Sequence, residues 1–398
     1  MKSIFIDITS MLHVIQRRNY TPYGIARVMI AYIQYFQDRA RAFVQWNGKP
    51  MILSKEDSDH LFQLILQPAN ATDSSLDCIQ RHHKKIGRRF FLRKRPLKES
   101  AALFQDAVLF VLNHAPVDFA YLRRANIAVV YMLHDLIPLQ YPEYCHQETI
   151  RQHEKLIYES LGELSGIITN SQATHDEFLA FRDQKQLKNV PPILPSLIAS
   201  NISTIKPQAA FMKKPYFVVI AAIEGRKNYF LLLHLWRQLV RDKGADSPVL
   251  VVIGCRGAKA ESVFDLLDEC TILKEAVEEL SSCSDEMLIT YLCHAQALLY
   301  PSFSEGYGLP LVEALSQRTP VIASDLPVFR EIAGDIPEYA DPLDGARWRA
   351  LIDAYSCADS PMRKAQLDRM ETLKLPTWEA HFTKVETFIQ SLHHSQPR

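Results

Sequence analysis

Residues 300–313 read YPSFSEGYGLPLVE, and this stretch decides the fold because it joins an apolar run to the start of a helix. The run, AQALLYPS (295–302), is typical of a buried strand. Pro310 suits the first turn of a helix, where its missing N–H costs nothing. Glu305 lies in the loop and Glu313 about one turn into the helix. The stretch therefore predicts a strand, a tight turn and a helix, with two carboxylates at their join.

The start of this predicted helix suits an anionic ligand. Backbone N–H groups of Tyr307, Gly308 and Leu309 would lie at the positive end of the helix dipole. A carboxylate accepts two hydrogen bonds, so Glu305 and Glu313 each suit a pair of sugar hydroxyls. The pattern favours phosphate in the middle with polyols on both sides, as in a nucleotide sugar. Two surface glutamates around a tight turn would give the same spacing.

Strand-like and helix-like segments alternate along the chain, which predicts an α/β fold with parallel sheets. One series of strands is SIFIDI, AFVQW, AVLFVL, IAVVYML and GIITN, and a second is YFVVIA, PVLVVIG, AQALLYP and PVIAS. Between them, residues 190–215 are rich in proline and predict a linker. Two Rossmann-like domains, 1–205 and 206–375, would then face each other across a cleft, with ligands at the carboxyl ends of the strands. Helices are expected over 25–36, 228–239, 285–293 and 309–317.

Composition and charge exclude some classes of protein. The 398 residues suffice for two domains, and their zero net charge argues against a nucleic-acid binder. The seven cysteines include no C-x-x-C pair, which predicts reduced thiols, mostly filling the core, in place of a zinc site or a disulfide framework. Neither a secretion signal nor a run of about 18 apolar residues is recognisable, so we expect a cytoplasmic protein.

A second motif, AAIEGRKNYF (221–230), follows the first strand of the second domain and opens a helix. It places Arg226 and Lys227 at the carboxyl end of a strand. Two adjacent cations there could neutralise a diphosphate leaving group as its bond to sugar breaks. The alternative is an ordinary surface pair at a helix start.

A third motif, VVYMLHDLIPL (129–139), places His134 directly after a strongly apolar strand of the first domain. The imidazole would face the cleft and could bond the transferring sugar, although a capping or core-edge histidine would fit the same pattern. We expect no D-x-D pair, the usual carboxylate pair for a nucleotide-bound divalent metal, anywhere in the chain. We therefore expect no metal, and the protein's cations would handle the leaving group.

One segment, RHHKKIGRRFFLRKRPLK (81–98), has nine Lys or Arg residues with Phe90 and Phe91 among them. It suits a solvated basic loop, or equally a patch that contacts anionic lipid at the inner face of a membrane. Nucleic-acid binding is the least favoured interpretation, because no recognition motif accompanies the charges.

The stretch PSFSEGYGLPLVEALSQRTPVIASDLPVFREIAG (301–334) resembles the signature of glycosyltransferase family 4, retaining enzymes of the GT-B fold. Its glutamates match the family's motif of two Glu separated by seven residues. AAIEGRKN resembles the family's phosphate loop, LHDLIPL its His-Asp segment, ITNSQATHDEF a helix start and TPYGIARVMIAYI its N-terminal glycine loop. The matches run from about residue 3 to Trp378, and a helix over 376–398 would pack back on the first domain.

The resemblance implies a role for each site residue. Glu313 would bind the ribose and Glu305 a hydroxyl of the transferred sugar. Arg226 and Lys227 would hold the diphosphate, and His134 would contact the sugar at the reacting centre. The other implied contacts are the base near Ser282 and Cys283, the sugar or phosphate at the backbone of Tyr307, Gly308 and Leu309, and the donor phosphates near Gly24.

Three positions depart from the family pattern. Gly225 replaces the usual proline, and Tyr23 stands where a first glycine is common. Ala221 stands where some relatives carry an additional phosphate-binding arginine, which leaves open how the two cations divide the phosphates.

The resemblance implies a retaining, metal-independent glycosyltransferase that uses a nucleoside-diphosphate sugar. Its acceptor, bound by the first domain, would be a saccharide or a lipid-linked oligosaccharide in bacterial surface polysaccharide (O-antigen, lipopolysaccharide or capsule) assembly. Similarity to polysaccharide mannosyltransferases favours GDP-mannose over UDP-hexoses as the donor. The alternatives are a sugar-nucleotide epimerase or phosphorylase of the same fold, or a non-catalytic GT-B partner subunit.

Overall fold

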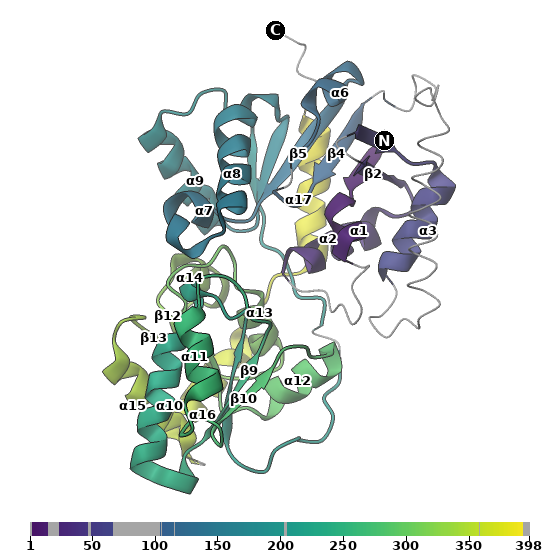
Figure 1. Ribbon diagram of the computed structural model, residues 1–398. Coiled ribbons are helices and arrows are strands. Elements are labelled where there is room, and N and C mark those ends of the chain that lie inside the picture. The colour runs from purple at the N-terminus through teal and green to yellow at the C-terminus, as the bar shows by residue number, and fades with distance from the viewer. Residues whose placement is uncertain are drawn as a thin grey trace.

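The computed structural model describes residues 2–14, 24–46, 49–66, 104, 106–114, 116–202, 205–357 and 359–392. Two sheets form the centres of two lobes, which Figure 1 shows one above the other. We call them the first lobe and the second lobe in chain order. The two α/β units predicted from the sequence are confirmed, whereas the basic segment 81–98 and Tyr23 lie outside the described residues.

The first sheet has seven strands in the order β3-β2-β1-β4-β5-β6-β7, and its strands are parallel except for β3, which runs antiparallel to β2. Its central strands are buried on both faces, which explains why the sequence marks them as continuous apolar runs. The strands are β1 Ile4–Asp7, β2 Ala40–Trp46, β3 Lys49–Ile52, β4 Ala107–Val111, β5 Ile127–Leu133, β6 Gly166–Thr169 and β7 Ile193–Pro195.

Strand β7 corrects the linker predicted over 190–215. Residues Ile193–Pro195 pair with β6 at the edge of the first sheet. Proline is tolerated there because an edge strand leaves one row of backbone groups unpaired. The connection between the sheets therefore begins after Pro195 and ends before Tyr216, the first residue of β8. The domain division predicted between residues 205 and 206 falls within this connection and stays a prediction.

The second sheet has six parallel strands in the order β10-β9-β8-β11-β12-β13. In both sheets the strand order reverses beside the first strand, and such a reversal opens a crevice at the carboxyl ends of the strands. Strands β10 and β13 were not predicted, because the glutamates of VEEL and EYA hide their pattern. The strands are β8 Tyr216–Ile220, β9 Val249–Ile253, β10 Val277–Leu280, β11 Leu298–Tyr300, β12 Val321–Ser324 and β13 Glu338–Ala340.

The helices predicted over 25–36, 285–293 and 309–317 are confirmed within one residue, and the helix predicted over 228–239 continues to Lys243. In the first lobe they are α1 Thr9–Val14, α2 Ile25–Phe36, α3 Lys55–Leu66, α6 Phe119–Arg124, α7 Ile137–Gln140, α8 Gln147–Glu154 and α9 Gln172–Lys185. In the second lobe they are α10 Tyr229–Lys243, α11 Glu261–Glu269, α12 Asp285–His294, α13 Leu309–Ser316, α14 Pro327–Ala333, α15 Gly345–Ser356 and α16 Pro361–Arg369.

The last helix, α17 (Trp378–Ser391), returns from the second lobe to the first. Figure 1 shows it in yellow beside α2. Phe382 stacks on Tyr35 with ring centroids 4.0 Å apart, and the hydroxyl of Tyr32 lies 2.9 Å from Nε2 of His381. The expectation that the C-terminal helix packs back on the first lobe is confirmed.

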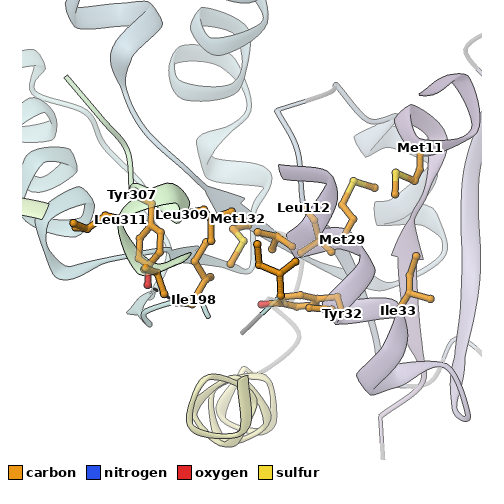
Figure 2. Packing of buried hydrophobic residues seen from close by; sticks show 14 of the residues in the cluster. Met11, Met29, Tyr32, Ile33, Leu112, Met132, Ile198, Tyr307, Leu309 and Leu311 are labelled. Atoms are coloured by element: carbon orange, nitrogen blue, oxygen red, sulfur yellow. Dashed lines mark hydrogen bonds between the residues drawn. The ribbon is translucent and has the colours of Figure 1, made fainter. Parts of the chain in front are cut away.

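One apolar cluster runs through both lobes, as Figure 2 shows for part of it. Met29, Tyr32 and Met132 belong to the first lobe, whereas Tyr307 and Leu309 belong to the second. The two lobes therefore share buried apolar surface beside the cleft.

Two further sequence-based expectations need correction. A D-x-D spacing does occur outside the three motifs, at Asp57-Ser58-Asp59, but it lies in the first turns of α3, where Asp59 pairs with Lys55. Of the six described cysteines, all free, only Cys283 is buried, so the thiols do not mostly fill the core.

Within the described residues, no helix is both long and apolar enough to cross a membrane.

Candidate functional site

A cavity of about 530 Å³ lies between the carboxyl ends of the two sheets. This is where parallel α/β sheets bind ligands. Every residue that the sequence assigned to the site lines it, namely Gly24, His134, Arg226, Lys227, Ser282, Cys283, Glu305, Tyr307, Gly308, Leu309 and Glu313. Residues up to 289 positions apart in the chain therefore meet in one place, although their individual roles stay predictions.

The turn before α13 depends on two glycines. Gly308 has φ = 114°, and a Cβ atom there would lie 2.6 Å from the ring of Phe329. A Cβ atom on Gly306 would lie 2.3 Å from the carbonyl oxygen of His134, in the other lobe. Glycine is needed at both positions because no other residue fits. The helix start is thus pressed against the opposite wall of the cleft.

Glu305 is the centre of a buried ion-pair network. Its Oε1 accepts hydrogen bonds from Nζ of Lys227 at 2.5 Å and from Oγ of Ser302 at 2.7 Å, and its Oε2 accepts one from Nη1 of Arg226 at 3.0 Å. Burial alone would raise the pKa of Glu305, but the two cations and the hydrogen bonds outweigh it and lower the pKa to about 2. Glu305 is therefore ionised and already holds both cations of the second motif.

The cations themselves come from a tight loop after β8. Gly225, where the family pattern has proline, approaches another loop so closely that a Cβ atom would lie 2.5 Å from the carbonyl oxygen of Lys259. Arg226 also pairs with Glu224, at 3.2 Å. Burial lowers the pKa of Lys227, and the neighbouring Arg226 acts in the same direction. An ammonium has three N–H donors and a guanidinium five, so both cations can keep Glu305 and still donate to a phosphate.

Among the carboxylates that line the cavity, Glu313 is the most enclosed. It lies in α13 with 3% of its surface exposed, and its Oε1 is 3.8 Å from Nη1 of Arg27, a residue of α2 in the first lobe. Burial raises the pKa of Glu313, and Arg27 opposes that shift. A carboxylate with this environment can accept hydrogen bonds from two vicinal hydroxyls.

His134 lies at the end of β5 on the first-lobe side of the cavity. Its Nε2 is 2.9 Å from the carbonyl oxygen of Leu112, and since a carbonyl can only accept, Nε2 carries the proton. Burial lowers the pKa of His134, so the ring is neutral and its Nδ1 is an acceptor. Asn170 donates to the carbonyl oxygen of His134 at 2.9 Å and fixes the backbone of this wall. A sugar hydroxyl is a suitable donor to Nδ1.

The far end of the cavity follows β9 and β10. Ser282 and Cys283 line it, together with Gly254. Burial raises the pKa of Cys283 to about 11, so the group is a thiol and not a nucleophile. The lining includes the apolar side chains of Ile253 and Leu288 as well as the hydroxyl of Ser282, which suits a heterocycle with polar edges.

Direct contacts hold the two walls together. Thr174 of α9 donates to the carbonyl oxygen of Gly306 at 3.0 Å, and the hydroxyl of Tyr307 donates to the carbonyl oxygen of Ile198. The carboxylate of Glu331 accepts the N–H groups of Gln172 and Ala173, at 2.8 Å each, and so caps α9 from the opposite lobe.

The sequence argument missed several residues of this site. Three of them line the cavity: Arg27, Glu224 and Asn170. Two others contact lining residues: Ser302 donates a hydrogen bond to Glu305, and Asp285 pairs with Arg27. Arg27 lies three positions after Gly24 in the quoted glycine loop, so its place in that motif was the available signal.

The chain is similar in sequence to known glycosyltransferases. Residues 201–336 match the family model described as Glycosyl transferases group 1. The chain is 29% identical over 279 residues to the serotype-specific mannosyltransferase WbdA of Escherichia coli, an alignment that covers 64% of this chain and 34% of WbdA. It is also 29% identical over 279 residues to the O-antigen chain mannosyltransferase B of Escherichia coli, covering 64% of this chain and 70% of that one. The alignment thus spans about a third of the length of WbdA.

The fold also has solved counterparts. The crystal structure of Anabaena HepE, in complex with UDP and glucose, matches with a TM-score of 0.66 at 14% identity, over 98% of this chain and 100% of that chain. Sucrose-phosphate synthase from Thermosynechococcus elongatus matches with a TM-score of 0.63 at 15% identity, over 98% and 99%. The arrangement of the two lobes is that of the GT-B fold.

Proposed function

Because residues 201–336 match the family model of the group 1 glycosyltransferases, we propose that the chain transfers a hexose from a nucleoside-diphosphate sugar to a saccharide or lipid-linked acceptor, with retention and without a metal ion. One observation carries this proposal: two cations and two carboxylates from separate motifs converge on a single cavity at the carboxyl ends of both sheets. The donor lies on the second lobe and the acceptor approaches from the first.

Within this proposal each part of the cavity binds one part of the donor. The base enters the part of the cavity beside Ser282 and Cys283, and the ribose binds Glu313. The diphosphate lies between the start of α13 and the loop that carries Arg226 and Lys227. A nucleoside diphosphate then reaches from Glu313 to Arg226 and Lys227, and the transferred sugar lies next to His134. The contacts of Glu305 with both cations support a role in orienting them.

Retention follows from a front-face reaction in this geometry. The bond between the anomeric carbon and the phosphate oxygen breaks, and the acceptor hydroxyl oxygen bonds to the same face of that carbon. The acceptor's proton goes to the departing phosphate, whose negative charge Arg226 and Lys227 stabilise. Neutral His134 supports the sugar by accepting a hydrogen bond at Nδ1. No covalent protein intermediate is required.

The donor is GDP-mannose, and the acceptor is an oligosaccharide of a bacterial surface polysaccharide. Support comes from the relatives, since WbdA and the O-antigen chain mannosyltransferase B are both named as mannosyltransferases. The acceptor's lipid link is consistent with the basic segment 81–98, which lies outside the described residues.

The proposal is tested by incubating the purified protein with GDP-mannose, UDP-glucose or UDP-N-acetylglucosamine and a set of α-mannoside acceptors. We expect release of GDP from GDP-mannose that requires acceptor, and a product with an α linkage. Release of nucleotide without acceptor would favour the epimerase or phosphorylase alternative. A protein that binds nucleotide but releases none with any acceptor or donor would favour a non-catalytic subunit.

Replacing Glu313 with alanine is expected to raise the KM for the donor with a smaller effect on kcat. Ribose hydroxyls make the same hydrogen bonds in the ground state and the transition state, so their loss removes uniform binding. The loss of even one charge-assisted hydrogen bond, about 1.5–3 kcal/mol, corresponds to an increase in KM of roughly 10- to 150-fold. Initial rates over a range of donor concentrations measure it.

The matched control is Glu371→Ala, which removes an exposed glutamate of the same lobe whose ion pair with Arg318 spans 3.8 Å. Its KM should equal that of the wild type. A large fall in kcat for Glu313→Ala with unchanged donor KM would contradict the assignment of the ribose.

The transfer activity is expected to survive excess EDTA. In this proposal the charge on the leaving diphosphate is neutralised by Arg226 and Lys227, which no chelator removes. The transfer rate in about 10 mM EDTA should stay within about twofold of the rate without EDTA. Complete loss of activity that magnesium or manganese restores would overturn the metal-free mechanism.

A further inference from the structure

Arg27 belongs to the first lobe, but its guanidinium lies between two carboxylates of the second. Its Nη2 is 2.5 Å from Oδ1 of Asp285, the first residue of α12, and its Nη1 is 3.8 Å from Oε1 of Glu313 in α13. The Arg27 side chain is 10% exposed. An exposed ion pair contributes little to stability, whereas a charge enclosed to this degree requires its partners. The contact depends on the cleft being closed.

The backbone of Arg27 is tied to the connections between the lobes. Its carbonyl oxygen accepts a hydrogen bond from Nδ2 of Asn201 at 3.1 Å, and Asn201 lies in the segment that joins the two sheets. Oδ1 of Asn201 in turn accepts a hydrogen bond from Nε1 of Trp378, the first residue of α17. Both chain crossings between the lobes therefore meet at this residue. A rotation of one lobe against the other would move the guanidinium relative to Glu313.

The groups that face Glu313 define what Arg27 does there. They are Arg27 from α2, Asp285 from α12 and Tyr300 from β11. Burial raises the pKa of Tyr300 well above its ordinary value, so that side chain is neutral. Among the groups that face Glu313 in the described part of the chain, Arg27 is the one cation, and Asp285 opposes it. Burial alone would favour the protonated form of Glu313. The positive charge of Arg27 opposes this shift and favours the carboxylate.

We propose that Arg27 is a positioning residue for the donor: its guanidinium, carried by the first lobe, holds the ribose-binding carboxylate of Glu313 in the second lobe, so that donor binding and closure of the cleft favour each other. This inference rests on the proposed function, which places the ribose on Glu313. The coupling is reciprocal, because a ligand that binds better to the closed form must also stabilise that form.

The test is the dissociation constant of GDP and of UDP, measured by calorimetry between pH 5.5 and 8.5. Arg27→Met keeps the apolar stem and removes the charge. We expect it to weaken binding roughly 5- to 150-fold, the usual range for coupled sites. Without Arg27 the pKa of Glu313 rises further. As the pH falls, the variant therefore loses its affinity at a higher pH than the wild type does, and part of the lost affinity returns when the pH is raised.

Asp285→Asn should act in the opposite direction on the pH profile. It removes the negative charge that raises the pKa of Glu313, so the loss of affinity on acidification moves to lower pH. A merely structural ion pair would instead weaken binding in both variants alike. Arg27→Lys should restore part of the affinity, because it keeps the charge. The matched control Arg123→Met removes an exposed arginine of the same lobe, paired with Glu163 at 3.2 Å, and should bind as the wild type does.

Small-angle scattering in saturating nucleotide tests the closure directly. The radius of gyration of Arg27→Met is expected to exceed that of the wild type, and equal values would overturn the coupling. Equal dissociation constants and pH profiles for Arg27→Met and wild type would overturn the role of Arg27, as would weakening by the same factor at every pH. If the wild type binds neither GDP nor UDP at any pH, the proposed function itself fails, and that outcome is distinct from the others.

Discussion

Lys227→Ala is expected to lower kcat by about 10²–10³-fold, the usual cost of removing one group that stabilises developing charge. The ammonium is buried, and in this structure Glu305 holds it in place at 2.5 Å. Its interaction with the phosphate strengthens as the glycosidic bond breaks, so its loss affects the transition state more than the bound donor. Steady-state kinetics with GDP-mannose, together with the Kd of guanosine, separate the two effects.

The matched control is Lys243→Ala. Lys243 lies in the same lobe and pairs with Asp353 at 2.6 Å, but it lies outside the cavity. Its kcat should equal that of the wild type. Near-normal turnover in Lys227→Ala would contradict the assignment of the leaving-group site. If the Kd of guanosine instead rose by the same factor by which kcat fell, Lys227 would contribute equally to the ground state and the transition state.

Glu305→Ala is expected to lower the free energy of unfolding by about 3–5 kcal/mol, because it leaves Arg226 and Lys227 buried without their shared counter-charge. Ser302 also loses its acceptor at 2.7 Å. Chemical denaturation followed by circular dichroism measures the change. The variant should also lose transfer activity, since neither cation keeps its position.

Glu163→Ala is the control for this change, because its ion pair with Arg123 is exposed at the surface and should contribute less than about 1 kcal/mol. The pH dependence gives a second check. The pKa of Glu305 is depressed to about 2 from an ordinary value of 4.5, so its contribution is complete above that ordinary value and is lost as the pH falls toward 2. Wild-type stability should fall more steeply than that of Glu305→Gln in this window, and parallel curves would contradict the ion-pair network.

Much of the fold follows from local sequence patterns. The apolar runs of β5 and β8 and the glycine–proline turn before α13 each specify their structure through neighbouring residues. The same patterns located the cavity residues, because side chains that follow parallel strands meet at one edge of a sheet. Strand β7 was missed, since its prolines read as a linker and only its pairing with β6 makes it a strand.

Contacts between distant residues could not be predicted in this way. Glu305 and Lys227 are 78 positions apart, and Arg27 and Asp285 are 258 apart. Each motif presents its charges separately. Glu305 and Lys227 pair only when two loops of the second lobe come together, and Arg27 and Asp285 pair only when the two lobes meet. For this reason the sequence suggested a carboxylate offered to sugar hydroxyls, whereas the structure shows Glu305 occupied by two cations and a serine.

The central claim is that the cavity between the lobes binds a nucleoside-diphosphate sugar with its diphosphate on the cations of the second lobe. A crystal structure of the complex with GDP-mannose tests it most directly. The account predicts diphosphate oxygens within hydrogen-bonding distance of Arg226 and Lys227, ribose hydroxyls on Glu313, and mannose beside His134. A nucleotide ordered elsewhere, or one whose diphosphate lies away from both cations, would contradict it.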